Sequence, residues 1–583
     1  MRIRKSLLAL VLVLAMVLPL FTVVASDGTF EGIGQGRNGQ IVLEVTIKDK
    51  VITAIACTQQ SETPGYADGI RKLADAVVAQ NSLAVDAVSG STYTSAGFME
   101  ALKDAVSKAG LTEADFSAKA EAQQATRTDA EETHQLVVVG AGGAGMVAAI
   151  SAKLSGANDV VLLEKQPFVG GNTLISGAEF AAPGNWLQKE EGIEDNAELF
   201  YQDVLKAGGN PDLIRVLADN SLEDALWLRD EVGVEWIDEL MFFGGHTVKR
   251  SLIPKGNTGT ELVTKMKAKC EALGVDIRVN TRATELITNE AGDVVGVKAQ
   301  SPDQNITFHA KAVVLTTGGF GNNVEMRKQY DPNVDEQVLS TNARGIDGDG
   351  IVMAEKIGAA TVGMEYIQLY PICHPDTGAL LYVDDTRLFG KTIIVNKEGN
   401  RFVEELGTRY EMSMGIKAQT GAVAYELMTL KDATDAGVPQ NHAAEVADLL
   451  KTGTMVQGNT LKEVAEAMGV DAQQLEKTVE TWNGYVENGK DLEFNKRGTL
   501  YPIGEGPYWL LKCAPAVHHT MGGIMIDTSA HVLRADGTVI KGLYAAGETT
   551  GGIHGNNRLG SAAIADITVF GKIAGETAAA ETK

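Results

Sequence analysis

The sequence predicts an α/β fold with a parallel sheet at its centre, and three observations along the chain predict it. Residues 136–139 (LVVV) and 160–163 (VVLL) are short apolar runs of the kind found in buried strands. Between them lie the glycine-rich segment 140–145 and the apolar helical segment 146–150. Glu164 follows the second run, about 20 residues after the glycines. This order of strand, glycine turn, helix, strand and acid is typical of a Rossmann-type dinucleotide-binding domain.

Each residue of this motif has a physical role in binding a dinucleotide. Gly140 allows the tight turn, Gly142 lets the backbone approach a pyrophosphate, and Gly145 lets the helix pack closely on the strand. The helix N-terminus offers free N–H groups and a partial positive charge to the phosphates. Glu164 can accept a hydrogen bond from a ribose hydroxyl. The alternative is a glycine-rich loop with a structural role only, but the two strands and the acid favour dinucleotide binding.

A second glycine turn, residues 170–173 (GGNT), suits a cofactor that lies extended across the domain. With this turn the chain resembles the FAD-containing fumarate reductase and succinate dehydrogenase flavoprotein family. Residues 316–320 (TTGGF), 345–350 (GIDGDG) and 545–548 (AAGE) agree, so the resemblance covers most of residues 134–583. It implies non-covalent FAD rather than NAD. The residues that it assigns to the cofactor are Gly140, Gly142, Gly143, Ala144, Gly145, Glu164, Lys165, Gly171, Asn172, Thr173, Gly177, Ala178, Asp347, Gly547, Glu548, Ala563 and Ile564.

Length and composition exclude several classes of protein. A chain of 583 residues is too long for one hydrophobic core and predicts about two to four domains. The net charge of -25 argues against nucleic acid or an anionic membrane surface as a partner. The widely spaced cysteines indicate neither a disulfide framework nor a metal site. The sequence has no Cys-x-x-Cys-His motif, which excludes covalent c-type haem from this chain.

Residues 1–26 have the pattern of an export signal. Basic residues precede an apolar run over residues 7–24, and Ala25 and Ser26 offer a cleavage site. The alternative is an uncleaved membrane anchor, since roughly 18 apolar residues just span a bilayer. Both place the folded part on the periplasmic or extracellular side of the cytoplasmic membrane. Soluble NAD(P)H is scarce there, so we expect electrons from an external donor protein, such as a membrane quinol-oxidising cytochrome or flavoprotein.

Residues 27–117 predict a small α+β domain. Apolar and polar residues alternate on both sides of a turn at residues 48–50, which predicts a β-hairpin, and helices are expected over 68–80 and 96–109. Residues 86–95 (DAVSGSTYTS) resemble the FMN-binding domain of membrane-associated redox proteins, whose Ser-Gly-Ala-Thr motif binds FMN through a phosphoester. The resemblance implies covalent FMN on Thr92, with Ser91 in place of the usual alanine. The polar residues 118–133 predict a linker.

The family resemblance also divides the rest of the chain. It implies a Rossmann-type FAD-binding domain built from residues 134–365 and 518–583. Residues 366–517 lie between the two substrate-binding stretches of the family and are expected to form an inserted, mobile α+β capping domain.

One segment of the predicted capping domain resembles the proton-donating segment of the fumarate reductases. Residues 395–405 (VNKEGNRFVEE) lead to Thr408-Arg409-Tyr410, where the family has Thr-Arg-Asp. The resemblance makes Arg409 the proton donor. Because a free guanidinium has a pKa above 12, it can act as an acid only if its proton is replaced at once. Asp384 and Arg387 are the residues that the resemblance supplies for this replacement.

Two further segments resemble the carboxylate-binding loops of the family. Residues 515–523 (PAVHHTMGG) provide His518, and residues 554–560 (HGNNRLG) provide Arg558. A guanidinium fork and a histidine donor together can fix the plane of a carboxylate. Tyr370 stands where the fumarate and succinate enzymes have a histidine that holds a second carboxylate. This exchange removes a cationic donor and adds an aromatic face, which favours a flat ring carrying one acrylate arm. We expect Tyr370 to hold the carboxylate of that arm together with His518 and Arg558.

Acidic residues sharpen the expected substrate. Glu179 and the pair Asp384-Asp385 can present carboxylates at the end of the substrate away from Arg558. Carboxylates there would repel fumarate and accept hydrogen bonds from the N–H groups of an imidazole. The alternative is that Glu179 and Asp385 are ordinary solvated or paired acids. Of the two neighbouring aspartates, the sequence does not decide which one contacts the ring, and Asp385 is our prediction.

These observations predict an exported flavin-dependent 2-enoate reductase. The expected substrate is a urocanate-like enoate, which is reduced by hydride from FAD and a proton from Arg409, with electrons delivered through FMN on Thr92. Within the same family, fumarate, cinnamate-like or acrylate substrates are the alternatives. A flavin electron-carrier protein without a small-molecule reaction is the alternative from another class.

Overall fold

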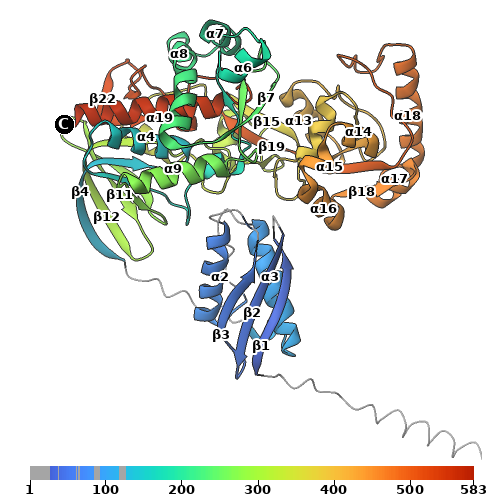
Figure 1. Cartoon of the computed structure of the whole chain (residues 1–583), viewed down its shortest axis with the longest axis horizontal. Helices are drawn as coiled ribbons and strands as arrows, with labels where there is room; N and C mark the ends of the chain where they lie inside the picture. The colour runs from blue at the N-terminus through green and yellow to red at the C-terminus, as the bar shows by residue number, and fades with distance from the viewer. Residues whose placement is uncertain (1–26, 37–38, 61, 63–65, 84–91, 117–126) are drawn as a thin grey trace, which may run out of the picture. The chain divides into compact units, whose positions relative to one another are not determined.

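The computed structural model of the chain describes residues 27–36, 39–60, 62, 66–83, 92–116 and 127–583 (Figure 1). Contacts within the chain define two compact units, with the division after Gln124. The predicted export signal, residues 1–26, lies outside the described residues. In the part of the chain that the structure describes, no helix combines the length and the apolar composition needed to span a membrane.

The N-terminal unit is an antiparallel sheet with helices packed against it. The strands lie in the order β1 (Gly28–Gln35), β2 (Gln40–Lys48) and β3 (Val51–Gln59). The helices are α2 (Tyr66–Gln80), α3 (Thr92–Lys108) and the 3₁₀ turn η1 (Glu113–Phe116). The predicted hairpin is confirmed: Lys48 pairs with Val51, and Asp49 and Lys50 between them have φ of 51° and 59°. Two successive positive φ values are typical of the tight turns that join antiparallel strands.

The strand β1 was not predicted from the sequence, because glycines stand where β-branched residues are usual in a strand. A Cβ atom at Gly32 would lie 1.9 Å from the carbonyl oxygen of Ala101, and one at Gly34 would lie 2.0 Å from that of Gly97. The glycines therefore let α3 pack directly on the strand. The predicted helix over residues 96–109 begins earlier, at Thr92.

The large unit is built on an eight-stranded sheet with the order β10-β11-β12-β4-β5-β9, to which β22 and β21 add beside β12. Its central strands are parallel, and their registers bring Leu136 beside both Val160 and Ala312. The strands are β4 (Thr128–Val139), β5 (Val160–Leu163), β9 (Asp276–Arg278), β10 (Arg282–Thr288), β11 (Val294–Gln300), β12 (Gln304–Leu315), β21 (His531–Leu533) and β22 (Val539–Ala545). Because β4 begins at Thr128, the last residues of the predicted linker 118–133 are part of this sheet.

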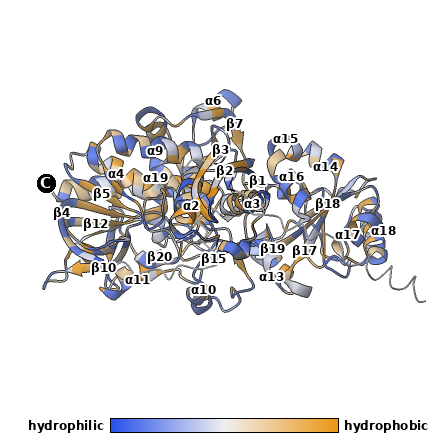
Figure 2. Ribbon diagram, turned by 90° about the horizontal axis from the view of Figure 1, so that it is seen from below, coloured by the Kyte–Doolittle hydropathy of each residue, from blue (hydrophilic) through white to orange (hydrophobic). Residues whose placement is uncertain are grey.

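Helices cover this sheet through small, apolar faces. The helix α4 (Gly143–Leu154) follows the glycine turn, and α19 (Ala562–Glu581) packs against it. Figure 2 shows β5 in the colours of hydrophobic residues, and the side chains of β5 are buried throughout. The other elements of this part are α5 (Gly171–Ile175), β6 (Phe180–Ala181), α6 (Trp186–Glu191), α7 (Ala197–Leu205), α8 (Pro211–Trp227), η2 (Leu228–Val232), β7 (Trp236–Met241), β8 (Ser251–Pro254), α9 (Thr260–Ala272), α10 (Val324–Tyr330), β13 (Leu339–Ser340), α11 (Asp349–Lys356), β14 (Thr361–Val362), β20 (Gly523–Ile524) and η5 (Gly547–Thr549).

Residues between the two FAD-binding stretches form a second sheet. The strand β19 (Tyr508–Thr520) pairs with β13, β15 and β17, and also with β18. In Figure 1, β15 (Ile367–Cys373) and β19 run from the FAD-binding part into the part that contains α13 to α18. The remaining elements are η3 (Tyr382–Asp384), α12 (Asp385–Leu388), β16 (Ile393–Val395), α13 (Arg409–Lys417), η4 (Thr420–Ala422), β17 (Ala424–Thr429), α14 (Leu430–Asp435), α15 (Val438–Asn441), α16 (Ala443–Thr452), β18 (Met455–Gly458), α17 (Leu461–Met468) and α18 (Ala472–Glu487).

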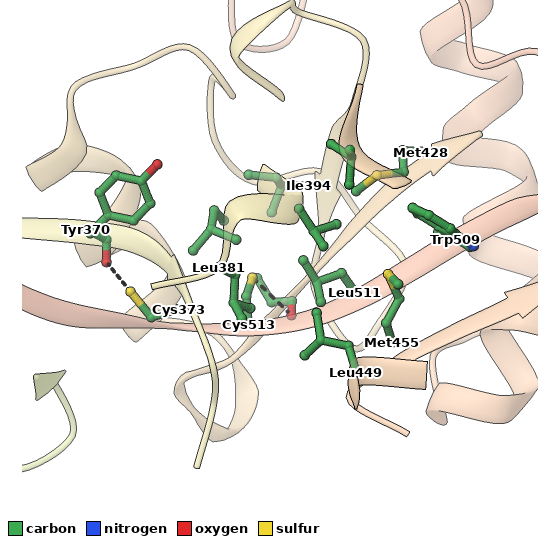
Figure 3. Packing of buried hydrophobic residues seen from close by; sticks show 14 of the residues in the cluster. Tyr370, Cys373, Leu381, Ile394, Met428, Leu449, Met455, Trp509, Leu511 and Cys513 are labelled. Carbon is green, nitrogen blue, oxygen red and sulfur yellow. Dashed lines mark hydrogen bonds between the residues drawn. The ribbon is translucent and has the colours of Figure 1, made fainter. Parts of the chain in front are cut away.

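The core of the capping part reaches the strand that carries Tyr370. A cluster of buried side chains extends from Tyr370 and Cys373 on β15, through Leu511 and Cys513 on β19, to Trp509 (Figure 3). This packing fixes β15 and β19 against each other where the chain passes between the two parts. The predicted domain limits at 365/366 and 517/518 lie next to β15 and within β19.

Candidate active site

A pocket in the FAD-binding part is lined by most of the residues predicted to bind the cofactor. These residues come from the turn after β4, the end of β5 and the start of α5, so they meet where the parallel strands end. Ligands bind at this edge in open α/β sheets. The predicted residues that line the pocket are Gly140, Gly142, Gly143, Ala144, Glu164, Lys165, Gly171, Asn172, Thr173 and Glu548.

The glycines of the turn fit a dinucleotide. A Cβ atom at Gly142 would meet nothing closer than the carbonyl oxygen of Gly170 at 4.0 Å, so bare backbone faces the pocket. Gly140 has φ of +104°, and a Cβ there would lie 2.5 Å from the carbonyl oxygen of Thr316. Gly142 caps the N-terminus of α4, whose free N–H groups suit a pyrophosphate. The residues present therefore fit FAD at this site.

Glu164 and Lys165 are held in place at the end of β5. The Glu164 carboxylate accepts hydrogen bonds from the backbone N–H groups of Ala141, at 3.0 Å, and Gln166, at 2.8 Å. Burial raises the pKa of Glu164, and these hydrogen bonds act in the opposite direction. Each carboxylate oxygen retains a further lone pair, which a ribose hydroxyl can use. Lys165 pairs with Asp347 and, at 2.8 Å, with Asp349.

The other predicted cofactor residues do not line this pocket. A Cβ at Gly145 would lie 1.8 Å from the carbonyl oxygen of Gly140, so this glycine allows the close helix packing that the motif predicts. A Cβ atom at Gly547 would lie 2.9 Å from the Cβ atom of Ala144, so this glycine also allows close packing against α4. Asp347 contacts Lys165 rather than the pocket. Contacts of Gly177, Ala178, Ala563 and Ile564 with the cofactor stay a prediction.

Several residues of the pocket were not predicted as cofactor residues. Thr316, Gly318 and Gly345 belong to segments that carry the family resemblance, so the signal for them was present in the sequence. Arg282, Met353 and Ile567 stand alone in the sequence and reach the pocket only through the packing of β10, α11 and α19. The others are Val139, Leu163, Gln166, Thr281, Ala283, Thr317, Arg344, Ile346, Asp349 and Ala546.

The strands β15 and β19 bring the predicted substrate residues together. In their antiparallel register Gln368 lies opposite His519, and Tyr370 lies opposite Ala516. The rings of Tyr370 and His518 are 5.7 Å apart between centroids. Arg409, at the start of α13, places its guanidinium 4.9 Å from the centroid of the Tyr370 ring. Residues distant in the sequence thus meet beside β15, as the family resemblance predicts.

Two guanidinium groups share one acceptor in this site. The side-chain oxygen of Gln368 accepts a hydrogen bond from Arg558 at 3.0 Å and from Arg409 at 3.4 Å. Gln368 is fixed by its own donor group, which bonds Asn557 and the carbonyl oxygen of Arg558, both at 2.9 Å. The sequence did not single out Gln368 as a site residue, because nothing in its pattern shows that two arginines converge on it.

The electrostatics of these arginines favour an anionic ligand. Burial, together with the charge of Arg409, lowers the pKa of Arg558 to about 10. Burial also lowers the pKa of Arg409. Among the described residues, neither guanidinium has a carboxylate within ion-pair distance, and the Nε atom of Arg558 is buried without a hydrogen-bond partner. An anion that binds here would therefore satisfy groups that the protein leaves unpaired.

His518 is a neutral donor or acceptor in this site. Burial and the charges of Arg558 and Arg409 lower its pKa well below the ordinary value. Its Nδ1 atom lies 3.0 Å from the Thr341 hydroxyl, so Nε2 is the ring atom left for a substrate. His519 contacts a different group: its Nδ1 atom is 3.7 Å from Glu548, which lines the FAD pocket. That His518 rather than His519 meets the substrate stays a prediction.

Asp384 and Arg387 form a buried ion pair behind Tyr370. The Nε and Nη2 atoms of Arg387 each donate a hydrogen bond of 2.6 Å to Asp384. The Tyr370 hydroxyl donates to the same carboxylate at 2.9 Å. Burial raises the pKa of Asp384 and of Tyr370, while the charge of Arg387 opposes both effects. Asp384 thus has its partners within the protein and does not present a free carboxylate to a ligand.

Glu179 and Asp385 are the acids that remain available. Asp385 is partly exposed and lies 3.6 Å from Nε2 of His442. Glu179 has no ion-pair partner among the described residues. Burial raises the pKa of Glu179, and the charge of Asp385 raises it further, whereas the charge of Arg558 lowers it. The charges of Asp385 and Arg558 therefore shift the pKa of Glu179 in opposite directions. This favours Asp385 over Asp384 as the predicted ring-binding aspartate.

The comparisons with known proteins agree with this site. The model of the FAD binding domain family matches residues 135–564, and that of the FMN-binding domain family matches residues 36–107. The urocanate reductase of Eggerthella lenta is 44% identical over 94% of this chain and 92% of its own length. The fumarate reductase (cytochrome) of Shewanella frigidimarina is 38% identical, with 80% of each chain covered.

The fold is also similar to that of a solved structure. The open conformation of a flavocytochrome c3 fumarate reductase superposes with a TM-score of 0.71 and 37% identity, covering 77% of this chain and 79% of that one. The expected FAD-binding domain and the expected FMN-binding domain are both confirmed. The chain therefore belongs to the FAD-dependent fumarate reductase and succinate dehydrogenase flavoprotein family, whose members are flavin-dependent reductases of carbon–carbon double bonds, and it also has an N-terminal FMN-binding domain.

Proposed function

We propose that this chain is an exported enzyme that reduces urocanate to imidazole propionate. One observation carries the proposal: among the described residues, two guanidinium groups without an ion-pair partner and the carboxylate of Glu179, which has none either, belong to one site. Arg558 and Arg409 suit the carboxylate of an acrylate arm, and Glu179 and Asp385 suit the N–H groups of an imidazole ring. The 44% identity to a urocanate reductase supports the same substrate.

Each residue of the site has a role in this reaction. Arg558 and the Nε2 atom of His518 bind the substrate carboxylate and draw electron density toward it, which prepares the β-carbon. When bound, reduced FAD supplies the electron pair and one of the two hydrogen atoms that the double bond gains. Arg409 donates the second hydrogen as a proton to the α-carbon. Asp384 and Arg387 then return a proton to Arg409, because its neutral form must be recharged before another turnover.

The acids Glu179 and Asp385, proposed to bind the ring, support urocanate over fumarate as the substrate. A neutral imidazole N–H can donate a hydrogen bond to Glu179 or Asp385. The second carboxylate of fumarate would instead face like charges, which costs several kcal/mol when both groups are desolvated. Tyr370 supports the carboxylate end instead, because its ring lies 5.7 Å from that of His518 and its hydroxyl is already engaged with Asp384. The site therefore favours a ring with N–H groups over a dicarboxylate.

Removal of the acids tests this assignment. In anaerobic assays with reduced viologen, we expect Glu179→Gln and Asp385→Asn each to lower kcat/KM for urocanate by roughly 10- to 100-fold, the cost of about one to two charged hydrogen bonds. Turnover of fumarate should rise or stay unchanged in both variants, because a repulsive charge is removed. Asp376→Asn, at an exposed acid of the same part, is the control. Faster turnover of fumarate than of urocanate by the unaltered enzyme would contradict the proposed substrate.

We further propose that FMN is attached to Thr92 and receives electrons from an external donor protein. The threonine begins α3, although its side chain and the preceding residues 84–91 lie outside the described residues. Two residues further, the buried Thr94 hydroxyl bonds the Glu62 carboxylate, which anchors the start of this helix. A net charge of -25 argues against an anionic membrane surface as a partner.

The attachment site has a direct test. We expect Thr92→Ala to remove the flavin that stays with the chain after denaturation, while FAD is still released from the same sample. Mass spectrometry of the intact chain and fluorescence of a denaturing gel measure this loss, and Thr53→Ala, at an exposed threonine of β3, is the control. Covalent flavin retained at full stoichiometry in Thr92→Ala would place the attachment elsewhere.

A further inference from the structure

The segment that carries Glu179 is held in place at both of its ends. It begins after α5, where the carbonyl oxygen of Ser176 accepts a hydrogen bond of 2.7 Å from the backbone N–H of Gly259. It ends at β6, where Phe180 pairs with Leu252 on β8 and has no exposed surface. The residues between these two fixed points therefore form a short turn with a defined backbone.

This turn bends sharply at Ala178. The residue has φ of 57°, and its side chain is buried. A residue with a Cβ atom rarely adopts this left-handed conformation, which persists only where the surrounding structure holds it. The bend brings the end of the Glu179 side chain back over Gly177, which stands two residues earlier in the chain.

The carboxyl group of Glu179 occupies the space where Gly177 lacks a side chain. A Cβ atom at Gly177 would lie 2.3 Å from Oε1 of Glu179, 2.8 Å from its Cδ and 2.9 Å from its Oε2. The backbone of Gly177 itself is compatible with other residues, because its φ is outside the left-handed region. An alanine at this position would therefore displace the flexible end of the Glu179 side chain rather than the backbone.

The turn is joined by hydrogen bonds to the segment that carries Arg558. Ala181, two residues after Glu179, donates a backbone hydrogen bond of 3.3 Å to the carbonyl oxygen of Ser561. Ser561 lies three residues after Arg558 and is the N-cap of α19. Its hydroxyl oxygen is also 2.6 Å from that of Ser251 on β8, the strand that pairs with β6. These contacts fix the segment of the acidic side chain relative to the segment of the guanidinium.

We propose that Gly177 is a specificity-determining residue of the substrate site. Because it has no side chain, the Glu179 carboxylate can lie against the turn and accept hydrogen bonds from N–H groups at the far end of the substrate. This inference rests on the proposed function, in which Glu179 binds the imidazole ring. A larger side chain at this position moves the carboxylate away from the ring. The preference for an enoate with an N–H donor is then lost, although Glu179 is still present.

Substitution of the glycine alone gives the first test. In Gly177→Ala, we expect kcat/KM for urocanate to fall by roughly tenfold, mostly through a higher KM, the effect of losing about one hydrogen bond to a charged group. The melting temperature should be unchanged, because the atoms nearest to the new methyl group belong to the end of a flexible side chain. A crystal structure of the variant should show the Glu179 carboxylate displaced and the backbone of the turn unmoved. Gly244→Ala is the matched control, since a Cβ atom there meets nothing within 4 Å.

A double-mutant cycle separates this role from a structural one. Glu179→Ala removes the group for which Gly177 makes room, so adding Gly177→Ala to it should change kcat/KM for urocanate by less than about twofold. A glycine needed only for the backbone or for FAD would instead cause the same fall in both backgrounds. Anaerobic assays with reduced viologen measure the cycle, and the flavin absorbance spectrum of each variant reports whether FAD is retained.

The outcomes also separate this inference from the proposed function. An unchanged kcat/KM in Gly177→Ala, an equal fall in both backgrounds, or loss of FAD from Gly177→Ala would each overturn the role of Gly177. In each of these cases, a fall in kcat/KM for urocanate in Glu179→Ala would leave the proposed function standing. An unchanged kcat/KM in Glu179→Ala would contradict the role of Glu179 in the proposed function itself.

Discussion

Replacement of Arg409 by lysine is expected to lower kcat for the enoate substrate by about 10²- to 10⁴-fold, the range that a positioned general acid contributes. The guanidinium reaches Gln368 at 3.4 Å and lies over the Tyr370 ring at 4.9 Å. A lysine ammonium keeps the charge but is a compact point charge without the planar fork, so it cannot occupy both contacts. The proton then lies away from the α-carbon, although the site keeps its net charge.

Binding and chemistry should separate in this variant. Because Arg558 and His518 are unchanged, we expect KM to change by less than about tenfold, which corresponds to 1.4 kcal/mol. Anaerobic oxidation of reduced viologen measures both constants, and the flavin absorbance spectrum checks that FAD is retained. Arg497→Lys, at an exposed arginine of the same part that pairs with Glu404, is the matched control. Electron transfer that is unchanged in every assay of Arg409→Lys would favour an electron-carrier protein over a reductase.

The cofactor motif could be predicted from the sequence because its residues are neighbours in the chain. The turn at Gly140–Gly145, the strand before it and Glu164 after it form one local unit, and their roles follow from backbone geometry. The strand β1 shows the opposite case. Its glycines lower the local preference for a strand. The reason for them appears only in the packed structure, where a Cβ atom at Gly32 would lie 1.9 Å from the carbonyl oxygen of Ala101 on α3. Tertiary packing there overrides the local preference.

The substrate site divides in the same way. Arg409, His518 and Arg558 stand in segments long enough to carry a family resemblance, so the sequence locates them. Gln368, on which Arg409 and Arg558 converge, becomes a site residue only through the pairing of β15 with β19. The choice between the neighbouring Asp384 and Asp385 also needs the structure, because it depends on which carboxylate Arg387 and Tyr370 already occupy.

The second prediction of large effect concerns the glycine turn. Alanine in place of Gly145 should disrupt the fold, whereas alanine in place of Gly142 should weaken cofactor binding only. A Cβ at Gly145 would lie 1.8 Å from the carbonyl oxygen of Gly140 and 2.7 Å from the Thr316 hydroxyl oxygen. Neither the turn nor β12 can withdraw without breaking the central sheet. We expect Gly145→Ala to destabilise the large unit by about 3 kcal/mol or more, the upper range for overpacking, and to prevent recovery of flavin-loaded protein.

Gly142→Ala should instead keep the fold and lose the cofactor. Its backbone, with φ of -74° and ψ of -172°, suits alanine, and the nearest atom to the new Cβ is 4.0 Å away. The methyl group enters the pocket where the pyrophosphate would approach the backbone. We expect the melting temperature of the FAD-free protein to be unchanged and the affinity for FAD to fall about 10- to 100-fold, or 1.4 to 2.8 kcal/mol.

Thermal unfolding without FAD and flavin titration with FAD measure the two effects separately. Gly484→Ala, inside the helix α18 with no atom near its Cβ position, is the control and should raise stability by up to about 1 kcal/mol. If Gly142→Ala bound FAD normally, the pyrophosphate would lie elsewhere in the pocket. If Gly145→Ala were as stable as the control, the close approach of α4 to the turn would be wrong. Because the two substitutions add the same methyl group within one turn of helix, a difference between them can arise only from what that group meets.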